Sequence, residues 1–213
     1  WTGILAASHA PDLELVGVAA LAPASDLPAL VRAAQGSTVG RILSAYIVHA
    51  YAARYPELDA AALVRPGRRA VAAAIARRCL DGARALPTAL VAAALPGSLF
   101  AADPGDGPMG LRLAQNIPDR PIAAPVLLAQ GDIDPLVLPE VQATWVAQRC
   151  AAGQPIEFRR YPGRDHLSLV AADSPLVRDL VDWTRARFAG EPAGPSCGGD
   201  TAQGGGVGGP VVD

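Results

Sequence analysis

Two residues late in the chain, an aspartate and a histidine, have the types and positions needed for acid–base chemistry. Asp134 lies four residues after the apolar run 125–130, in a local Gly-x-x-Asp pattern. His166 lies five residues after the next expected strand, 156–161, in a Gly-x-x-His pattern. A carboxylate can hold an imidazole in one tautomer and stabilise its charged form, which general-base hydrolysis requires. The pair therefore predicts a hydrolase.

Each of these residues also has a simpler structural interpretation. Asp134 precedes a proline, and Asp-Pro pairs are common in turns, while Asp132 is a nearby rival for the acid. His166 is also consistent with a histidine in a surface loop. The agreement of strand, glycine and neighbouring pattern favours the acid and base roles for Asp134 and His166. The other two histidines, His9 and His49, lie within expected helices and are interpreted as packing or surface residues.

A hydrolase of this kind also needs a nucleophile, and Ser25 is the candidate that the chain offers as a substitute. It follows the apolar run 15–21, at the sheet edge where Asp134 is also expected. The alternative interpretation of Ser25 is a serine at the start of a helix. Ser168 lies only two residues from His166 on the same loop, which is a poor geometry for attack.

The elements that must position these residues follow from the hydrophobic pattern. Two short apolar runs, 15–21 and 125–130, are typical of strands buried on both faces. Residues 156–161 form a third expected strand, with Ile156 and Phe158 on one side, and apolar residues recur at helical spacing elsewhere. This order predicts an α/β fold with a parallel sheet, of which the chain supplies the second half. Right-handed crossovers bring the C-terminal strand ends to one edge, where open sheets bind ligands. The expected strands are 15–21, 125–130 and 156–161, and the expected helices are 1–10, 68–80, 88–95 and three that begin at residues 37, 139 and 174.

Residues 27–120 differ in their hydrophobic pattern from the parts of the chain on either side. They contain helical patterns but no strand candidate, and residues 96–120 are interpreted as a Gly/Pro-rich loop. We therefore expect four segments. Residues 1–26 begin a hydrolase half-domain, 27–120 form a helical insertion, 121–190 carry the acid and the histidine, and 191–213 form a Gly-rich tail predicted to be disordered.

The composition limits the partners of the chain. With 18 basic and 20 acidic residues the net charge is −2, so no basic patch for nucleic acid is expected and a small or neutral ligand is favoured. No apolar stretch is long enough to span a bilayer, which leaves at most contact with a lipid interface. The three cysteines and three histidines lack metal-ligand spacing, so neither a metal nor a cofactor is predicted.

The sequence around these residues resembles the secretory lipase family of α/β-hydrolases. The blocks that carry the resemblance are LAPASDL (21–27), APVLLAQGDIDPLVLP (124–139), WVAQRCAAGQPIEFRRYPGRDH (145–166) and VDWTRARFAG (181–190). The chain order of acid and then histidine also fits that fold. The resemblance implies that Asp134 and His166 are the acid and base of a catalytic triad. It implies a disulfide between Cys150 and Cys197, and a cap or lid in the inserted helices. It further implies a secreted lipase or esterase, acting on carboxylic esters from short- and medium-chain glycerides to polyesters.

The chain departs from the family pattern at the nucleophile. No G-x-S-x-G motif occurs, and the nearest sequence, GSTVG at 36–40, has its serine one position too early and lies in the expected cap. The usual serine, the earlier strands and a partner for Cys79 are therefore expected upstream of this chain. Strand 15–21 would then be an exposed apolar edge, so self-association into a homo-oligomer is expected. The alternative function is a truncated, catalytically incomplete hydrolase that dimerises and binds apolar esters without turnover.

Overall fold

The computed structural model describes residues 1–78, 82–194 and Cys197, and the chain divides into two compact units. The first, here called the sheet unit, contains residues 1–23, 119–134 and the chain from Gln142 onward. The second, the helical unit, contains residues 24–118 and 135–141. The division expected from the sequence placed 135–141 with the strands instead. Cys79 and the tail from residue 198 lie outside the described residues, so the predictions made for them are not addressed.

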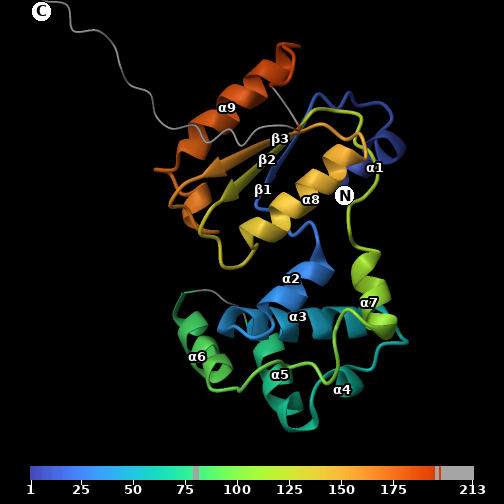
Figure 1. Ribbon diagram of the computed structural model, residues 1–213, viewed down its shortest axis with the longest axis vertical. Helices are drawn as coiled ribbons and strands as arrows, with labels where there is room; N and C mark the ends of the chain where they lie inside the picture. The colour runs from blue at the N-terminus through green and yellow to red at the C-terminus, as the bar shows by residue number, and fades with distance from the viewer. Residues whose placement is uncertain (79–81, 195–196, 198–213) are drawn as a thin grey trace, which may run out of the picture. The chain divides into compact units, whose positions relative to one another are not determined.

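A parallel sheet of three strands forms the centre of the sheet unit (Figure 1). Strand β2 (Val126–Gly131) lies between β1 (Val18–Leu21) and β3 (Ile156–Tyr161), and both pairings are parallel. All six residues of β2 are buried, which explains why its sequence is a nearly continuous apolar run. The predicted α/β fold class is confirmed.

Strand β1 is shorter than the apolar run 15–21 predicted. Val18 is the first residue of β1 and pairs with Val126, the first residue of β2. Residues before Val18 have no partner in the β2 ladder, and Leu15 is accordingly 39% exposed. Hydrophobicity alone could not locate this boundary, because it is set by where the neighbouring strand begins.

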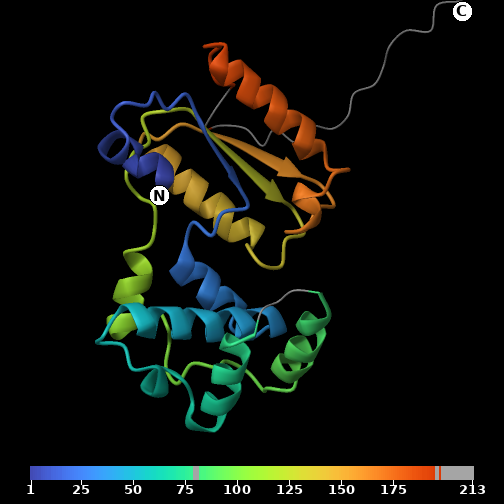
Figure 2. The same cartoon turned by 180° about the vertical axis from the view of Figure 1, so that it is seen from behind.

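Helices cover both faces of this sheet. Helices α8 (Pro139–Ala151) and α9 (Pro175–Phe188) lie on opposite sides of it in Figures 1 and 2. Helix α9 begins with Ser174 accepting a hydrogen bond from the backbone N–H of Leu176, with a proline in its first turn. The sheet unit is completed by α1 (Thr2–His9) and a short 3₁₀ turn, η2 (Ser168–Val170).

The described residues of the helical unit form helices and no strand of the sheet, as the hydrophobic pattern of 27–120 predicted. Its helices are α2 (Leu27–Ala34), α3 (Thr38–Arg54), α4 (Ala60–Leu63), η1 (Pro66–Arg68), α5 (Arg69–Ala76), α6 (Gly82–Ala93) and α7 (Gly107–Ala114). Asp26, Ser37 and Asp59 cap three of these helices, because each side chain accepts a hydrogen bond from a backbone N–H in the first turn.

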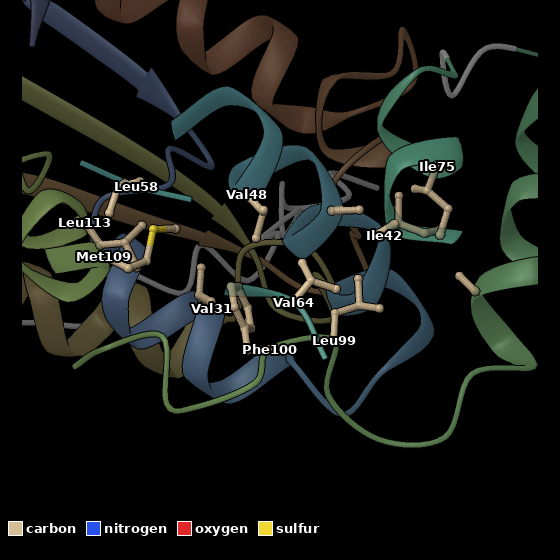
Figure 3. Packing of buried hydrophobic residues seen from close by; sticks show 13 residues of the cluster. Val31, Ile42, Val48, Leu58, Val64, Ile75, Leu99, Phe100, Met109 and Leu113 are labelled. Carbon is tan, nitrogen blue, oxygen red and sulfur yellow. The ribbon is translucent and has the colours of Figure 1, made fainter. Parts of the chain in front are cut away.

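The apolar faces of these helices enclose one core (Figure 3). Its fully buried members include Ile75, Leu99 and Leu113, each with no exposed surface. Burial of this kind stabilises by about 1.5–3 kcal/mol per large side chain. The helical unit therefore has a hydrophobic core of its own.

The prediction of a loop over residues 96–120 is wrong in one part, since Gly107–Ala114 forms helix α7. Gly107 and Pro108 were interpreted as helix breakers. Proline is tolerated in the first turn of a helix, where its missing N–H would have had no helical partner anyway. Met109 and Leu113 then bury one face of α7 in the core of the helical unit.

No helix in the described part of the chain is both long and apolar enough to cross a bilayer.

A disulfide joins Cys150, at the end of α8, to Cys197. The two cysteines are 47 residues apart in sequence, and the backbone N–H of Cys197 donates to the carbonyl oxygen of Ile156 in β3 (3.3 Å). The pairing that the family resemblance implied is thus present. It closes a loop containing β3 and α9.

We predict that replacing both cysteines with serine lowers the free energy of unfolding by about 2–4 kcal/mol, because the unfolded chain regains the entropy of the opened loop. Urea denaturation followed by circular dichroism measures this. Reducing agent should shift the parent by a similar amount and leave the double variant unchanged. An equal response of both proteins would contradict the prediction.

The loops that follow β2 and β3 are joined by hydrogen bonds. The backbone N–H of Ile133 donates to the carbonyl oxygen of Arg164 (3.2 Å), and the N–H of Gly163 donates to Oδ1 of Asp132 (2.6 Å). Gly131, the last residue of β2, allows this close approach, because a Cβ atom there would overlap the backbone carbonyl of Arg164. The two loops are thus held against each other by a backbone–backbone hydrogen bond and by one that the Asp132 side chain accepts.

We predict that Gly131→Ala lowers the free energy of unfolding by about 1–3 kcal/mol, because the added methyl group must push the backbone of the second loop away. Urea denaturation measures the cost, and the backbone amide shifts of residues 163–166 report the displacement. Gly36→Ala is the matched control, since nothing lies within 4 Å of a Cβ atom there. Equal and small effects of both changes would contradict the prediction.

Candidate active site

The structure brings together the acid and the histidine predicted from the sequence. His166 Nδ1 lies 2.8 Å from Asp134 Oδ2. The Asp134 side chain has no exposed surface, whereas 32% of the His166 side chain is exposed. An ionised carboxylate only accepts hydrogen bonds, so Nδ1 of the neutral ring is the donor and Nε2 is the nitrogen that remains able to accept a proton.

The loop that carries His166 is closed by the residues on either side of it. Oδ1 of Asp165 accepts hydrogen bonds from the backbone N–H groups of Leu167 (3.0 Å) and Ser168 (2.7 Å). The Ser168 hydroxyl donates to the same oxygen and accepts from the N–H of Asp165. These bonds, those from Ser168 first, lower the pKa of the Asp165 carboxyl. Ser168 therefore has a structural role in this turn.

Arg164 connects the same loop to the segment before α9. Its guanidinium contacts the Asp173 carboxylate (2.9 Å) and donates to the Asp173 carbonyl oxygen (3.1 Å). The ion pair lowers the pKa of Asp173. Because Asp173 is largely exposed, the pair contributes less to stability than to the direction in which the loop leaves β3.

Asp132, the rival candidate for the acid, is engaged elsewhere. Its Oδ1 accepts the hydrogen bond from Gly163 N–H described above, so it joins the two loops while Asp134 contacts the imidazole. The remaining histidines lie on exposed positions of helices: His9 ends α1 and His49 is on α3. Neither belongs to the acid–histidine pair.

Ser25 follows β1, as expected, and is 2% exposed. It belongs to the helical unit, whereas the pair belongs to the sheet unit. Its role as a substitute nucleophile therefore stays a prediction.

One residue of the site was missed by the sequence analysis. Gln130, in β2, donates from Nε2 to Oδ2 of Asp134 (3.3 Å). A glutamine within a run of valine, leucine and alanine was the available signal, and the sequence analysis assigned it no role. Within the described residues, no group of three or more His, Cys, Asp or Glu side chains could hold a metal ion.

Known proteins resemble this chain in part of its sequence and in its fold. The family model described as Secretory lipase matches residues 1–84. The matched region includes β1 and much of the helical unit but ends before the acid and the histidine. No curated protein matches the chain.

Solved structures match nearly the whole chain. Two structures of Candida antarctica lipase A, one in its closed state, are 21% and 20% identical, with TM-scores of 0.71 and 0.73. They align with 94% and 95% of this chain but with only 48% and 49% of their own. A Legionella pneumophila protein assigned as a hydrolase is 16% identical, with a TM-score of 0.65, and the match covers 89% of this chain and 53% of that one.

The chain thus spans about half the length of the lipases it matches. Its three parallel strands and their helices have the α/β-hydrolase fold in part. Together with the family match over residues 1–84, this confirms the resemblance to secretory lipases that the sequence predicted.

Proposed function

We propose that this chain supplies the acid and the base of a carboxylic ester hydrolase, a lipase or esterase that works by serine-type acyl transfer. The observation that supports the proposal is the 2.8 Å contact between a fully buried carboxylate and a partly exposed imidazole. The roles follow from this difference in exposure. Asp134 is shielded from water and orients the ring, while His166 can reach a substrate.

In the proposed reaction, Nε2 of His166 removes the proton from a serine hydroxyl as its oxygen attacks the ester carbonyl carbon. The Asp134 carboxylate stabilises the imidazolium that forms. The imidazolium then gives its proton to the departing alcohol oxygen as the carbon–oxygen bond breaks, which leaves an acyl-enzyme. Water, deprotonated in turn by His166, attacks this ester, and protonation of the serine oxygen releases the carboxylic acid.

The nucleophilic serine has two possible sources. Ser25 is the candidate that this sequence offers. The lipases that match the chain are about twice as long, so a serine outside these 213 residues is the other source. The two sources are separated by the experiment below.

The substrate class follows from the apolar character of the helical unit. A cavity of about 230 Å³ lies between its helices α3, α4 and α5 and is lined mainly by alanine and valine. Surfaces of this kind suit acyl chains rather than charged groups. We therefore propose acyl or aromatic esters as substrates, and polyesters as polymers that present the same bond.

Secretion is part of the same proposal. The secretory lipase match suggests export, and the Cys150–Cys197 disulfide fits an oxidising compartment.

The alternative is a protein that binds apolar esters without turnover and associates with a second copy. It is favoured by the position of β1, which is an edge strand of the described sheet and has β2 on one side only. Edge strands offer backbone groups for pairing with another chain. A dimer in size-exclusion chromatography, together with ester binding but no hydrolysis, would favour this alternative.

We predict that His166→Ala lowers kcat for p-nitrophenyl ester hydrolysis by at least about a thousandfold, because no base remains to deprotonate the serine. His9→Ala, a change at the exposed histidine that ends α1, is the matched control and should leave the rate unchanged.

A fluorophosphonate probe identifies the nucleophile in the same proteins. Labelling that disappears in Ser25→Ala assigns the role to Ser25, whereas labelling that persists assigns it to another serine. Hydrolysis that is indifferent to His166→Ala would overturn the proposal. The absence of both hydrolysis and labelling would exclude Ser25 and assign the nucleophile to a serine outside these 213 residues.

The turn that holds His166 should lose stability in acid. The folded-state pKa of Asp165 is lowered, so its contribution is present above the unfolded-state pKa, about 4, and is lost as the pH falls through the lowered value. We predict that Asp165→Asn is less stable than the parent at pH 7 and that the difference shrinks steadily below about pH 4.

Urea midpoints measured between pH 7 and pH 3 test this. Asp12→Asn changes an exposed aspartate outside the turn and serves as the control. A difference between Asp165→Asn and the parent that stays constant with pH would contradict the prediction.

A further inference from the structure

A primary amide is buried in the central strand of the sheet, next to the acid–histidine pair. Gln130 has no exposed surface, although the rest of β2 is made of Val, Leu, Ala and Gly. Burying an amide in such surroundings is unfavourable unless its polar atoms are hydrogen-bonded. The bonds that this side chain makes therefore indicate why it is tolerated here.

The amide and the imidazole bind the same carboxylate oxygen. Gln130 Nε2 lies 3.3 Å from Asp134 Oδ2, and His166 Nδ1 lies 2.8 Å from that oxygen. Gln130 Nε2 also donates to the carbonyl oxygen of Gly131 (3.1 Å). Both contacts are made to oxygens that only accept, so the NH₂ group of the amide must be the part that faces them.

We infer that Gln130 is a positioning residue, which fixes the Asp134 carboxylate so that Oδ2 faces His166 Nδ1. The inference rests on the proposed function, because the orientation matters only if His166 acts as a base. A donor fixed on a buried strand restricts rotation of the carboxylate about its side-chain bonds, and the oriented carboxylate in turn orients the ring.

Geometry on the strand supports this assignment. Gln130 pairs in register with Arg160 of β3, one residue before β2 and β3 both end. Its side chain therefore comes from the central, fully buried strand and reaches the loop four residues later in the chain. A donor on a mobile surface loop could not hold the carboxylate as firmly.

The test uses the full chain and the proton on Nδ1 of His166. A histidine N–H donated to a buried carboxylate gives a proton resonance at low field, well separated from the backbone amides, and His166→Ala assigns it by its loss. Two variants remove the Gln130 donor. Gln130→Met keeps the length of the side chain, and Gln130→Leu replaces the amide with a shorter apolar group.

Gln154→Met is the matched control. Gln154 is also buried, at 9% exposure, and its Oε1 accepts a hydrogen bond from Ile122 N–H (2.6 Å). It lies just before β3, so the same chemical change is made in the same unit at the opposite end of the strands. A merely structural effect of losing a buried amide should therefore appear in both.

We expect the low-field resonance to broaden and exchange faster in both Gln130 variants while remaining sharp in Gln154→Met. Where ester hydrolysis is measurable, kcat should fall about tenfold with KM unchanged, the size of effect seen for groups that orient a functional residue. A resonance that is unchanged in folded Gln130 variants would overturn the inference. A normal resonance in a parent whose hydrolysis is indifferent to His166→Ala would instead count against the proposed function and leave the positioning role standing.

Discussion

Parallel pairing obliges neighbouring strands to end at the same edge of a sheet, and the candidate site depends on this constraint. The register pairs Gly131 at the end of β2 with Tyr161 at the end of β3, so the two following loops begin side by side. The contact between Ile133 and Arg164 then joins them before either reaches its functional residue. A slip of one residue in this register would exchange the faces of every side chain in the strand, and the aspartate and histidine would no longer meet.

Burying the Asp134 carboxylate beside these loops is energetically costly. An isolated ionised carboxylate in the interior is strongly destabilising, and only good hydrogen bonds offset the loss of water. Oδ2 of Asp134 receives two of them, from His166 and from Gln130. Removing either donor leaves the charge less well satisfied, so stability and acid–base geometry are coupled at this position. The positioning role inferred for Gln130 accounts for an amide inside an otherwise apolar strand.

The sequence predicted the parts of this arrangement that local patterns encode. Residues 125–130 were predicted as a buried strand because they are nearly all apolar, and 156–161 as a strand with Ile156 and Phe158 on one side. Strand topology then places Asp134 and His166 at one edge. The start of β1 and the helix at 107–114 were not predicted, since the first depends on where β2 begins and the second on apolar contacts inside the helical unit. Gln130 was missed for a related reason. The partner of a single amide in a strand cannot be identified from the sequence, because it lies on a loop four residues later whose path depends on the fold.

The difference in exposure between the two partners also bears on the choice between catalysis and binding. Replacing buried ionised groups with apolar side chains of similar size is often neutral or stabilising, so a buried carboxylate is not an efficient way to hold a fold together. Binding of apolar esters needs neither a carboxylate nor an imidazole. An imidazole with one nitrogen fixed by a buried acid and the other side partly exposed is, by contrast, what proton transfer to and from a hydroxyl requires. Because the contacts among Gln130, Asp134 and His166 are all made within the sheet unit, this acid–base arrangement is the same whichever serine is brought to it.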